Sequence, residues 1–513
     1  MSNTDDSGTP PEERGPSGPA PRRGAYMEQL QRLGESGLFS PAQWRRRVLF
    51  WSGAVLVGLA AVGMASAADA LFGVFKSVVA HSRYWPLLIT PLTFAVLAWL
   101  TQGVLKPTRG SGIPQAMAAL EVEDESFRKS LLSLRIAIGK MALTLTALLG
   151  GASVGREGPT VHVGAGLLYT LGRRFGFSDA VGAGRFILAG SAAGLAAAFN
   201  TPLAGVVFAI EEMSGAFEHR MSGILLTAVI IAGVVSLGIL GNYAYFGRFD
   251  IMLPLGKAWL AVLATGLVCG LAGGLFARLI LPHDTGLRGM VGRLRARQPV
   301  VFAACCGLVL VLLSLLTHTG LYGTGYEQAK AILAGHSDTV QGFGALKFLG
   351  NIASYWAGIP GGIFSPALAV GAGLGNNISA LMPGTDPSAV VLLAMAAYLS
   401  GVTQAPLTAT VISMELTANQ QMALPIMAAC LLARAVSTLV CRKPVYHALA
   451  DRLVAGYQQE LERHAALERV QAAAAEGRDD PEDEALLARP VPVEDPSALH
   501  VMPDEPPPER PAP

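Results

Sequence analysis

Long apolar segments, broken by glycine and proline, occupy most of this chain of 513 residues. Hydrophobic residues make up 51% of it, and charged residues make up 15%, against about 25% in ordinary soluble domains. A helix needs roughly 20 apolar residues to cross a bilayer, and the backbone breaks there only where protein or water satisfies it. The sequence therefore predicts an all-α polytopic membrane protein with broken helices. The apolar segments lie at about residues 48–68, 85–104, 131–151, 186–210, 224–240, 259–281, 300–317, 367–382, 389–413 and 424–440.

The two ends of the chain differ from this apolar middle. They are rich in proline, glycine, alanine and charge, which predicts disorder, and no signal peptide pattern occurs in the first 40 residues. Arginines at 45–47 precede the first apolar segment, and Arg442 and Lys443 follow the last, so both ends are expected in the cytoplasm. We expect an N-terminal tail over 1–40, a transmembrane domain over 41–455, and a mostly disordered tail over 456–513. We expect no pair of regulatory domains in that last tail, although its first part, Tyr457–Ala475, can continue a helix.

The pattern Gly-x-x-x-Pro occurs three times inside the apolar region, at 110–114, 155–159 and 362–366. Glycine permits a tight backbone and proline is favoured at the start of a helix, so each motif predicts a helix start. The first N–H groups of a helix are unpaired and carry the positive end of its dipole, which suits an anion. The three motifs thus predict an anion site held by backbone amides. Its expected helix starts contain Gly110, Gly112, Pro114, Gly155, Arg156, Gly158, Pro159, Gly362, Ser365 and Pro366.

An internal repeat links two of these motifs. Residues 155–167 match 362–374 at a spacing of 207, and residues 200–211 match 404–415 at a spacing of 204. Two matches in the same order predict two homologous halves, at about 45–245 and 255–450. Repeated halves with broken helices usually enclose a substrate site at their interface, near the middle of the membrane. Periodicity alone leaves open whether the halves are inverted.

Glu157 lies in the Gly-Arg-Glu-Gly-Pro motif, at a predicted helix start. A membrane carboxylate is costly and is by default a functional candidate, but N–H groups and the helix dipole favour its charge. The same groups favour a small anion, so Glu157 and an anion can compete for one site, with protonation deciding between them. The alternative is a static capping carboxylate. Arg156 beside it either pairs with a carboxylate or steers anions.

Other polar residues allow two interpretations each. Ser111 either donates its hydroxyl to an anion or caps a helix. Glu211 and Glu212 point about 100° apart if helical, so one can be held by protein while the other takes up protons. Phe364, with Ile363 beside it, offers its backbone N–H and a ring that either shapes the path or only packs. Lys140 is expected as a structural counter-charge or a snorkelling end.

Taken together, these strings resemble the CLC family of chloride channels and chloride/proton antiporters. The signatures are Gly-Ser-Gly-Ile-Pro at 110–114, Gly-Arg-Glu-Gly-Pro at 155–159 and Gly-Gly-Ile-Phe-Ser-Pro at 361–366, in the family order. Asn-Thr-Pro-Leu-Ala-Gly at 200–205 and Lys-Pro-Val-Tyr at 443–446 extend the match over about residues 45–455. The resemblance implies a CLC-type fold of two inverted helical repeats with tilted helices, in a homodimer whose subunits each hold an anion pathway.

Residue roles follow from the same resemblance. Ser111, Ile363, Phe364 and Tyr446 are expected to bind chloride as a substrate, and Glu157 to act as the outer gating carboxylate. Glu212 is expected to transfer protons on the inner side, and no cofactor or metal is implied. Ser111 points to chloride, because nitrate-carrier relatives have proline there and fluoride-selective relatives depart more widely from these strings. Channels of the family usually lack an acid at the position of Glu212, so the resemblance implies coupled chloride/proton exchange. The expected absence of C-terminal regulatory domains suits a prokaryotic member, in the inner membrane.

Two alternatives remain open. One is a passive, gated chloride channel on the same fold, with Glu212 only structural. The other is an intramembrane enzyme with Glu157 and Glu211 or Glu212 as acid and base, but no nucleophile or metal motif supports it. Nucleic acid has no support from a net charge of +1.

Overall fold

The computed structural model describes residues 41–103, 105–176, 180–213, 222–241, 244–281, 290–316, 320–336 and 341–475. Contacts divide the chain into two units, Met1–Leu49 and Phe50–Pro513, and the described part of the first unit is helical. The predicted disorder of 1–40 and of the last part of the C-terminal tail lies outside the described residues. The predicted domain limits stay predictions.

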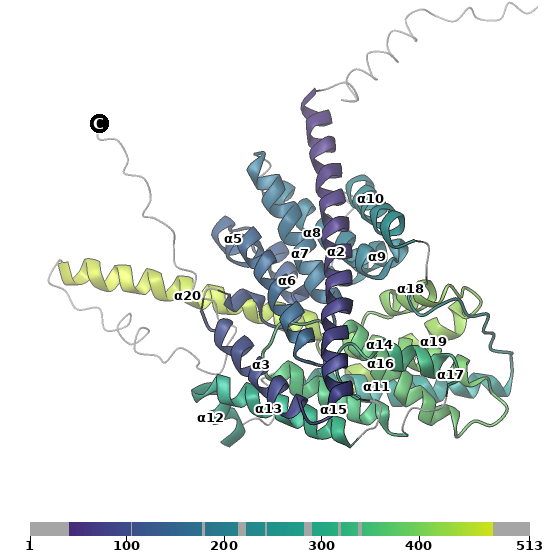
Figure 1. Cartoon of the computed structure of the whole chain (residues 1–513). Coiled ribbons are helices and arrows are strands. Elements are labelled where there is room, and N and C mark those ends of the chain that lie inside the picture. The colour runs from purple at the N-terminus through teal and green to yellow at the C-terminus, as the bar shows by residue number, and fades with distance from the viewer. Residues whose placement is uncertain are drawn as a thin grey trace, which may run out of the picture. The chain divides into compact units, whose positions relative to one another are not determined.

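All regular secondary structure among the described residues is helical, with no strand, which confirms the all-α prediction (Figure 1). Short turns η1 (Lys106–Thr108) and η3 (Lys257–Trp259) are 3₁₀, and η2 (Ala209–Met213) is a π-helix. The α-helices are α2 (Pro41–His81), α3 (Pro86–Leu100), α4 (Ile113–Glu121), α5 (Glu125–Leu132), α6 (Leu134–Leu149), α7 (Glu157–Arg174), α8 (Ala180–Phe199), α9 (Pro202–Phe208), α10 (Ser222–Leu240), α11 (Leu260–Ile280), α12 (Met290–Arg297), α13 (Pro299–Leu315), α14 (Tyr326–Leu333), α15 (Phe343–Trp356), α16 (Phe364–Ser379), α17 (Pro387–Thr403), α18 (Pro406–Thr417), α19 (Ala423–Val440) and α20 (Val445–Ala475).

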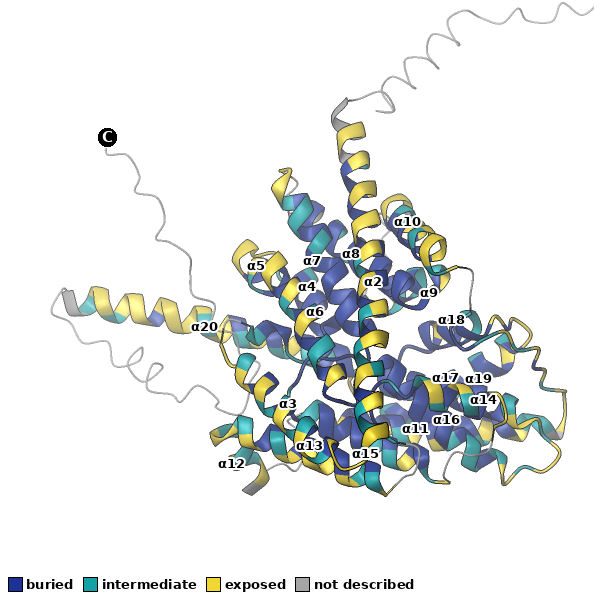
Figure 2. Ribbon diagram, in the orientation of Figure 1, coloured by how far each residue is buried: buried dark blue, intermediate teal, exposed yellow. Residues whose placement is uncertain are grey.

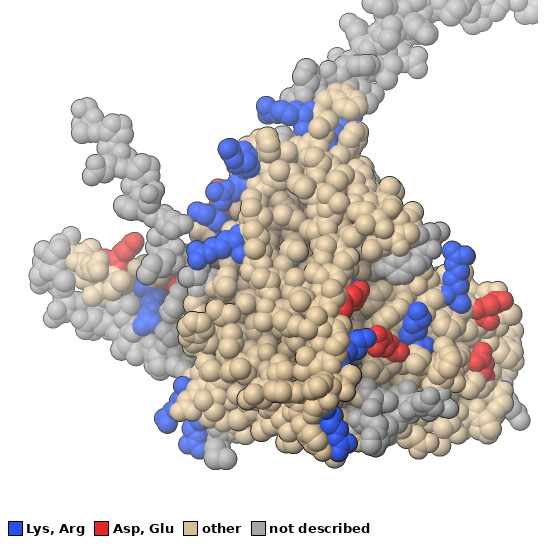
Figure 3. Space-filling model, in the orientation of Figure 1, with Lys and Arg blue, Asp and Glu red and all other residues tan. Residues whose placement is uncertain are grey.

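Six of the described helical stretches are long and apolar enough to cross a membrane, and α3, α13 and α17 are shorter apolar helices. Figure 3 shows a broad face without charged side chains and with blue side chains gathered near its margins. Figure 2 shows that buried residues concentrate where the helices pack, and that the far half of α20 is largely exposed. The helix in α20 continues to Ala475, as expected from the sequence.

The two longest predicted apolar segments are each broken once, at equivalent places. Between α8 and α9 the chain turns at Asn200, with a φ of 57°, and between α17 and α18 it turns at Gln404, with a φ of 60°. A proline begins the next helix in both cases, because a missing N–H costs nothing there. The breaks lie 204 residues apart, so they belong to the internal repeat.

The halves meet through reciprocal contacts across these breaks. The Glu211 carboxylate accepts hydrogen bonds from the N–H groups of Leu407 and Thr408, at 3.0 and 2.6 Å, at the start of α18. The Glu415 carboxylate accepts from the equivalent N–H groups at the start of α9, at 3.2 and 2.6 Å. Glu211 of the first half contacts the second half in the same way as Glu415 of the second half contacts the first. Such reciprocal contacts indicate an approximate two-fold axis between the halves. Each acid also satisfies helix-end donors that would otherwise lack a partner.

Two fully buried lysines, 207 residues apart, occupy equivalent places in α6 and α15. Lys140 Nζ donates to the carbonyls of Thr108 and Gly110, at 2.7 and 2.6 Å, just before α4 begins. Lys347 Nζ donates to Ser153 Oγ at 2.7 Å and to two loop carbonyls, those of Leu321 and Gly323, at 2.8 Å each. Both ammonium groups hold irregular backbone in place. Lys140 is therefore structural, but it is neither the counter-charge nor the snorkelling end that the sequence suggested, because its ammonium group is fully buried and donates to backbone carbonyls.

We expect Lys347→Met to lower the stability of the fold by about 3 kcal/mol or more, because it leaves several buried oxygens without a donor. The matched control is Lys76→Met, which removes an ion pair to Glu327 whose side chains are 47% and 59% exposed. That pair should contribute at most about 1 kcal/mol. Thermal unfolding of both variants in detergent measures the difference, and equal melting temperatures would contradict this assignment.

Candidate functional site

The three Gly-x-x-x-Pro motifs come together in the core. Gly155 and Gly362 exchange hydrogen bonds in both directions, N to O at 2.7 Å each, which is the reciprocal pattern again. The N–H of Gly361 donates to the carbonyl of Gly110 at 3.0 Å. Hydrogen bonds therefore join the backbone segments that precede α4, α7 and α16, and all three helices begin beside these segments. The sequence predicted three helix starts and their convergence, and the structure has both.

The prolines lie deeper in these helices than expected. The helices begin at Ile113, Glu157 and Phe364, so proline is the second residue of α4 and the third of α7 and α16. The difference is harmless, because the first four N–H groups of a helix have no partner within it. Gly112 precedes α4 with a φ of 101°, a conformation that side chains resist.

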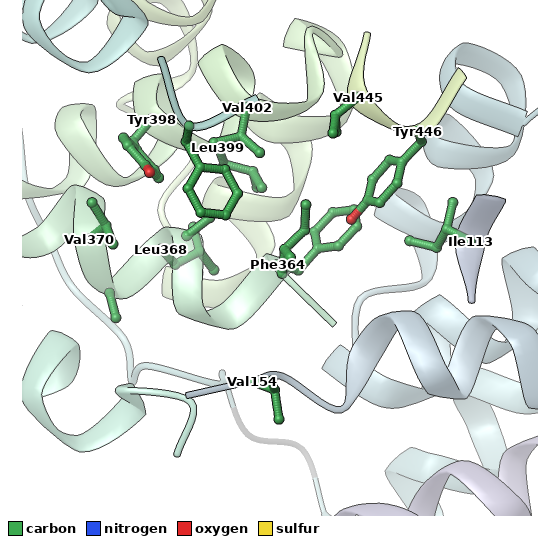
Figure 4. Close-up of a cluster of buried hydrophobic side chains, with 14 of the residues drawn as sticks. Ile113, Val154, Phe364, Leu368, Val370, Tyr398, Leu399, Val402, Val445 and Tyr446 are labelled. Atoms are coloured by element: carbon green, nitrogen blue, oxygen red, sulfur yellow. The ribbon is translucent and has the colours of Figure 1, made fainter. Parts of the chain in front are cut away.

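Two buried hydroxyls near these segments, those of Ser111 and Tyr446, lie close enough to interact with each other, but neither forms a well-formed hydrogen bond with a described residue. Ser111 therefore does not cap α4. Ser111 is 2% exposed and Tyr446 is fully buried. The Tyr446 ring stacks on Phe364, with centroids 6.0 Å apart and planes 17° from parallel, and Ile113 lies beside them (Figure 4). Buried hydroxyls are nearly always paired, so two without a well-formed hydrogen bond suit an acceptor such as a halide ion.

Glu157 is fully buried at the first position of α7. Its Oε1 accepts a hydrogen bond, at 2.5 Å, from the hydroxyl of Ser365 in the first turn of α16. Its Oε2 has no partner among the described residues. The carboxylate thus lies where two helix starts favour negative charge, held by one contact only. This is compatible with a movable group.

Arg156 pairs with a carboxylate, as one of its two interpretations required. Its guanidinium donates to Asp69 Oδ1 at 2.6 Å and to the carbonyl of Ala65 at 2.7 Å, both in α2. The arginine is nearly buried while Asp69 is largely exposed. The pair fixes the start of α7 against α2.

The two neighbouring acids, Glu211 and Glu212, both lie in the π-helix η2 and point to different surroundings. Glu211 is held by the start of α18, whereas the Glu212 side chain is 3% exposed and its Oε1 has no hydrogen-bond partner among the described residues. Single π turns inside helices often occur at functional sites. Glu211 is therefore held by protein contacts, as expected for one of the two acids, while proton uptake by Glu212 stays a prediction.

Sequence reasoning missed three features of this region. Ser365 was expected only to shape a helix start, but it contacts Glu157 directly. His447, not considered at all, lies with its Nδ1 3.8 Å from Glu212 Oε1. The string Gly-Thr-Gly-Tyr-Glu-Gln at 323–328 repeats Gly-Ser-Gly-Ile-Pro-Gln at 110–115, and a search for approximate repeats would have found it. In the structure the two strings begin α14 and α4.

Gly158 shows how little room the site has. A β-carbon at this position would overlap Ser111 Oγ. We expect Gly158→Ala to displace that hydroxyl and to weaken chloride binding at least about tenfold, which is about 1.4 kcal/mol. The control is Gly184→Ala in α8, where an added β-carbon meets no atom within 4 Å. Isothermal titration calorimetry with chloride checks both variants, and unchanged binding in Gly158→Ala would show that Ser111 is not at the site.

Broken helices that begin beside buried hydroxyls and carboxylates define an ion-transport protein of the membrane. Residues 92–438 match the sequence pattern of the voltage gated chloride channel family. The chain belongs to this family.

Named relatives agree with this membership. A ClcB-like chloride channel protein of Ralstonia nicotianae is 33% identical over 378 residues, which cover 70% of this chain and 85% of that protein. The H(+)/Cl(−) exchange transporter ClcA of Yersinia pestis is 30% identical over 409 residues, or 74% of this chain and 82% of the relative. A slow cyanobacterial Cl−/H+ antiporter has a similar solved structure, with a TM-score of 0.67, 25% identity, and coverage of 80% of this chain and 97% of that one. The fold is thus the CLC fold expected from the sequence.

Proposed function

We propose that this protein is a secondary-active antiporter that moves chloride across the membrane in exchange for protons. One arrangement carries the proposal: the Tyr446 hydroxyl, close to that of Ser111 but without a well-formed hydrogen bond, lies within electrostatic reach of two buried carboxylates, Glu157 and Glu212. An anion bound at the hydroxyl and a proton bound at either acid therefore influence each other's stability. The exchange transporter and antiporter among the relatives support the same activity.

Each of these residues has its own part in the exchange. Ser111 and Tyr446 donate hydroxyls to chloride, and the N–H groups of Ile363 and Phe364 complete its surroundings at the start of α16. Ionised Glu157 competes with chloride, because both are anions attracted by the same helix starts. Protonation of Glu157 removes its charge and leaves the site to chloride. Glu212 supplies or receives the proton on the other side of Tyr446.

Location and assembly are part of the proposal. The basic residues flanking the apolar region support a multi-pass inner-membrane protein with both termini in the cytoplasm. The homodimer is proposed from the family resemblance of the sequence motifs alone. We propose no catalytic activity and no cofactor, with chloride and protons as the transported partners.

Flux measurements in liposomes test the exchange. A chloride gradient is imposed while potassium and valinomycin clamp the membrane potential at zero, and the pH outside is recorded. Chloride moving down its gradient is expected to drive protons against theirs. Chloride movement without proton movement would instead identify a passive channel, the function named for the ClcB-like relative.

A further inference from the structure

The side chains of His447 and Glu212 face each other with both facing atoms unsatisfied. His447 Nδ1 and Glu212 Oε1 are 3.8 Å apart, and each is buried without a hydrogen-bond partner among the described residues. The distance is slightly too long for a hydrogen bond, but a small rotation or one water molecule closes it. Buried polar atoms that lack partners require an explanation.

Exposure of the two side chains is unequal. The Glu212 side chain is 3% exposed, while that of His447 is 38% exposed although its Nδ1 is enclosed. The imidazole therefore has one nitrogen turned toward the buried acid and other ring atoms open to the surface. A histidine can accept a proton at one nitrogen and release it from the other, and its ordinary pKa near 6.5 suits both steps.

The position of His447 in the chain links it to the anion site. It follows Tyr446 directly, at the start of α20, so one helical turn presents a hydroxyl to the site and an imidazole to Glu212. The carboxylates of Asp451 in α20 and Glu121 at the end of α4 are close enough for their charges to act on the ring. On the other side, the charge of Glu211 acts on Glu212. Lys443 is already paired with Asp451 at 2.7 Å.

We propose that His447 relays protons between the solution and Glu212. The neutral ring with its proton on Nδ1 accepts a second proton from hydronium at Nε2. It then gives the Nδ1 proton to Glu212 Oε1, which makes the acid neutral and leaves the ring neutral with its proton on Nε2. Exchange with water restores the first tautomer. This inference rests on the proposed exchange and specifies how its inner proton step occurs.

The test compares a titratable with a non-titratable side chain at this position. We expect His447→Gln to slow proton flux in liposomes at least about tenfold, since general acid–base groups contribute that much or more. His447→Glu should restore most of the flux and move its pH dependence toward the carboxylate range, near pH 4 to 5. His464→Gln is the control, because His464 lies exposed on the same helix and, among the described residues, its side chain is hydrogen-bonded to the carbonyl of Glu460.

Chloride flux separates a relay from a structural effect. In a Glu157→Gln background, where we expect chloride to move without protons, adding His447→Gln should leave chloride flux unchanged. A parallel loss of chloride flux would overturn the proposal, as would a His447→Gln variant with normal proton flux or a His447→Glu variant without recovery. If the unaltered protein moves no protons, the exchange itself fails and the relay fails with it. Normal exchange with an insensitive His447 refutes the relay alone.

Discussion

Replacing Glu212 with glutamine is expected to stop proton movement while chloride still crosses the membrane. The amide keeps the size of the side chain but cannot bind and release a proton, so the inner transfer step is lost. Proton flux should fall at least about 100-fold, a typical contribution of a proton-transferring group. Chloride flux should stay within the same order, because Glu212 is not among the groups expected to contact the ion.

The neighbouring acid provides the control. Glu211→Gln weakens the hydrogen bonds that the carboxylate accepts at the start of α18, so it should lower thermal stability and leave proton flux in place. Both variants are measured in the same liposome assay with the potential clamped. Persistent chloride-driven proton movement in Glu212→Gln would show that another group delivers the proton.

Glu157→Gln is expected to uncouple the two ions completely. The neutral amide resembles the protonated carboxyl, which by the proposed mechanism leaves the site to chloride. Chloride should therefore flow at every pH, whereas in the unaltered protein its flux should rise as the pH falls and Glu157 becomes protonated. Proton flux should fall below detection, because the outer proton carrier is gone.

Ser365→Ala serves as the milder comparison. It keeps the Glu157 carboxylate and removes the one hydrogen bond that this carboxylate accepts from the described residues. A side-chain hydrogen bond to a charged group contributes about 1.5–3 kcal/mol, so the carboxylate should leave the site more readily and chloride turnover should rise. Coupling should survive in this variant.

Retained pH dependence of chloride flux in Glu157→Gln would contradict the assignment of Glu157 as the gate.

The predictions from motifs were confirmed where glycine and proline themselves restrict the backbone. Glycine followed by proline in an apolar run specifies a helix start, and repeated spacing specifies a two-fold arrangement, so the meeting of three helix starts was predictable. The position of proline within the first turn was not, because several positions there are equally tolerant of a missing N–H.

Contacts between distant side chains were the harder part. The approach of His447 to Glu212 and of Ser365 to Glu157 depends on how two halves pack, which hydropathy and spacing do not encode. The buried lysines show the intermediate case. Lys140 is conspicuous as a charge in an apolar run. The equivalent lysine of the second half, Lys347, is found only when the repeat spacing of 207 is applied to single residues. Once the repeat is known, each half becomes a template for the other.

The wide turn at Ala209–Met213 makes this region sensitive to chain length as well as to residue type. Deleting one residue there, such as Ile210, would tighten the turn into ordinary α-helix and rotate the next residues by about 100°. Glu211 and Glu212 would turn together, so Glu211 would leave the start of α18 and Glu212 would leave His447. Deletion of a single residue here thus disrupts two contacts at once: that of Glu211 with the start of α18 and that of Glu212 with His447. A point substitution usually affects only one of these contacts.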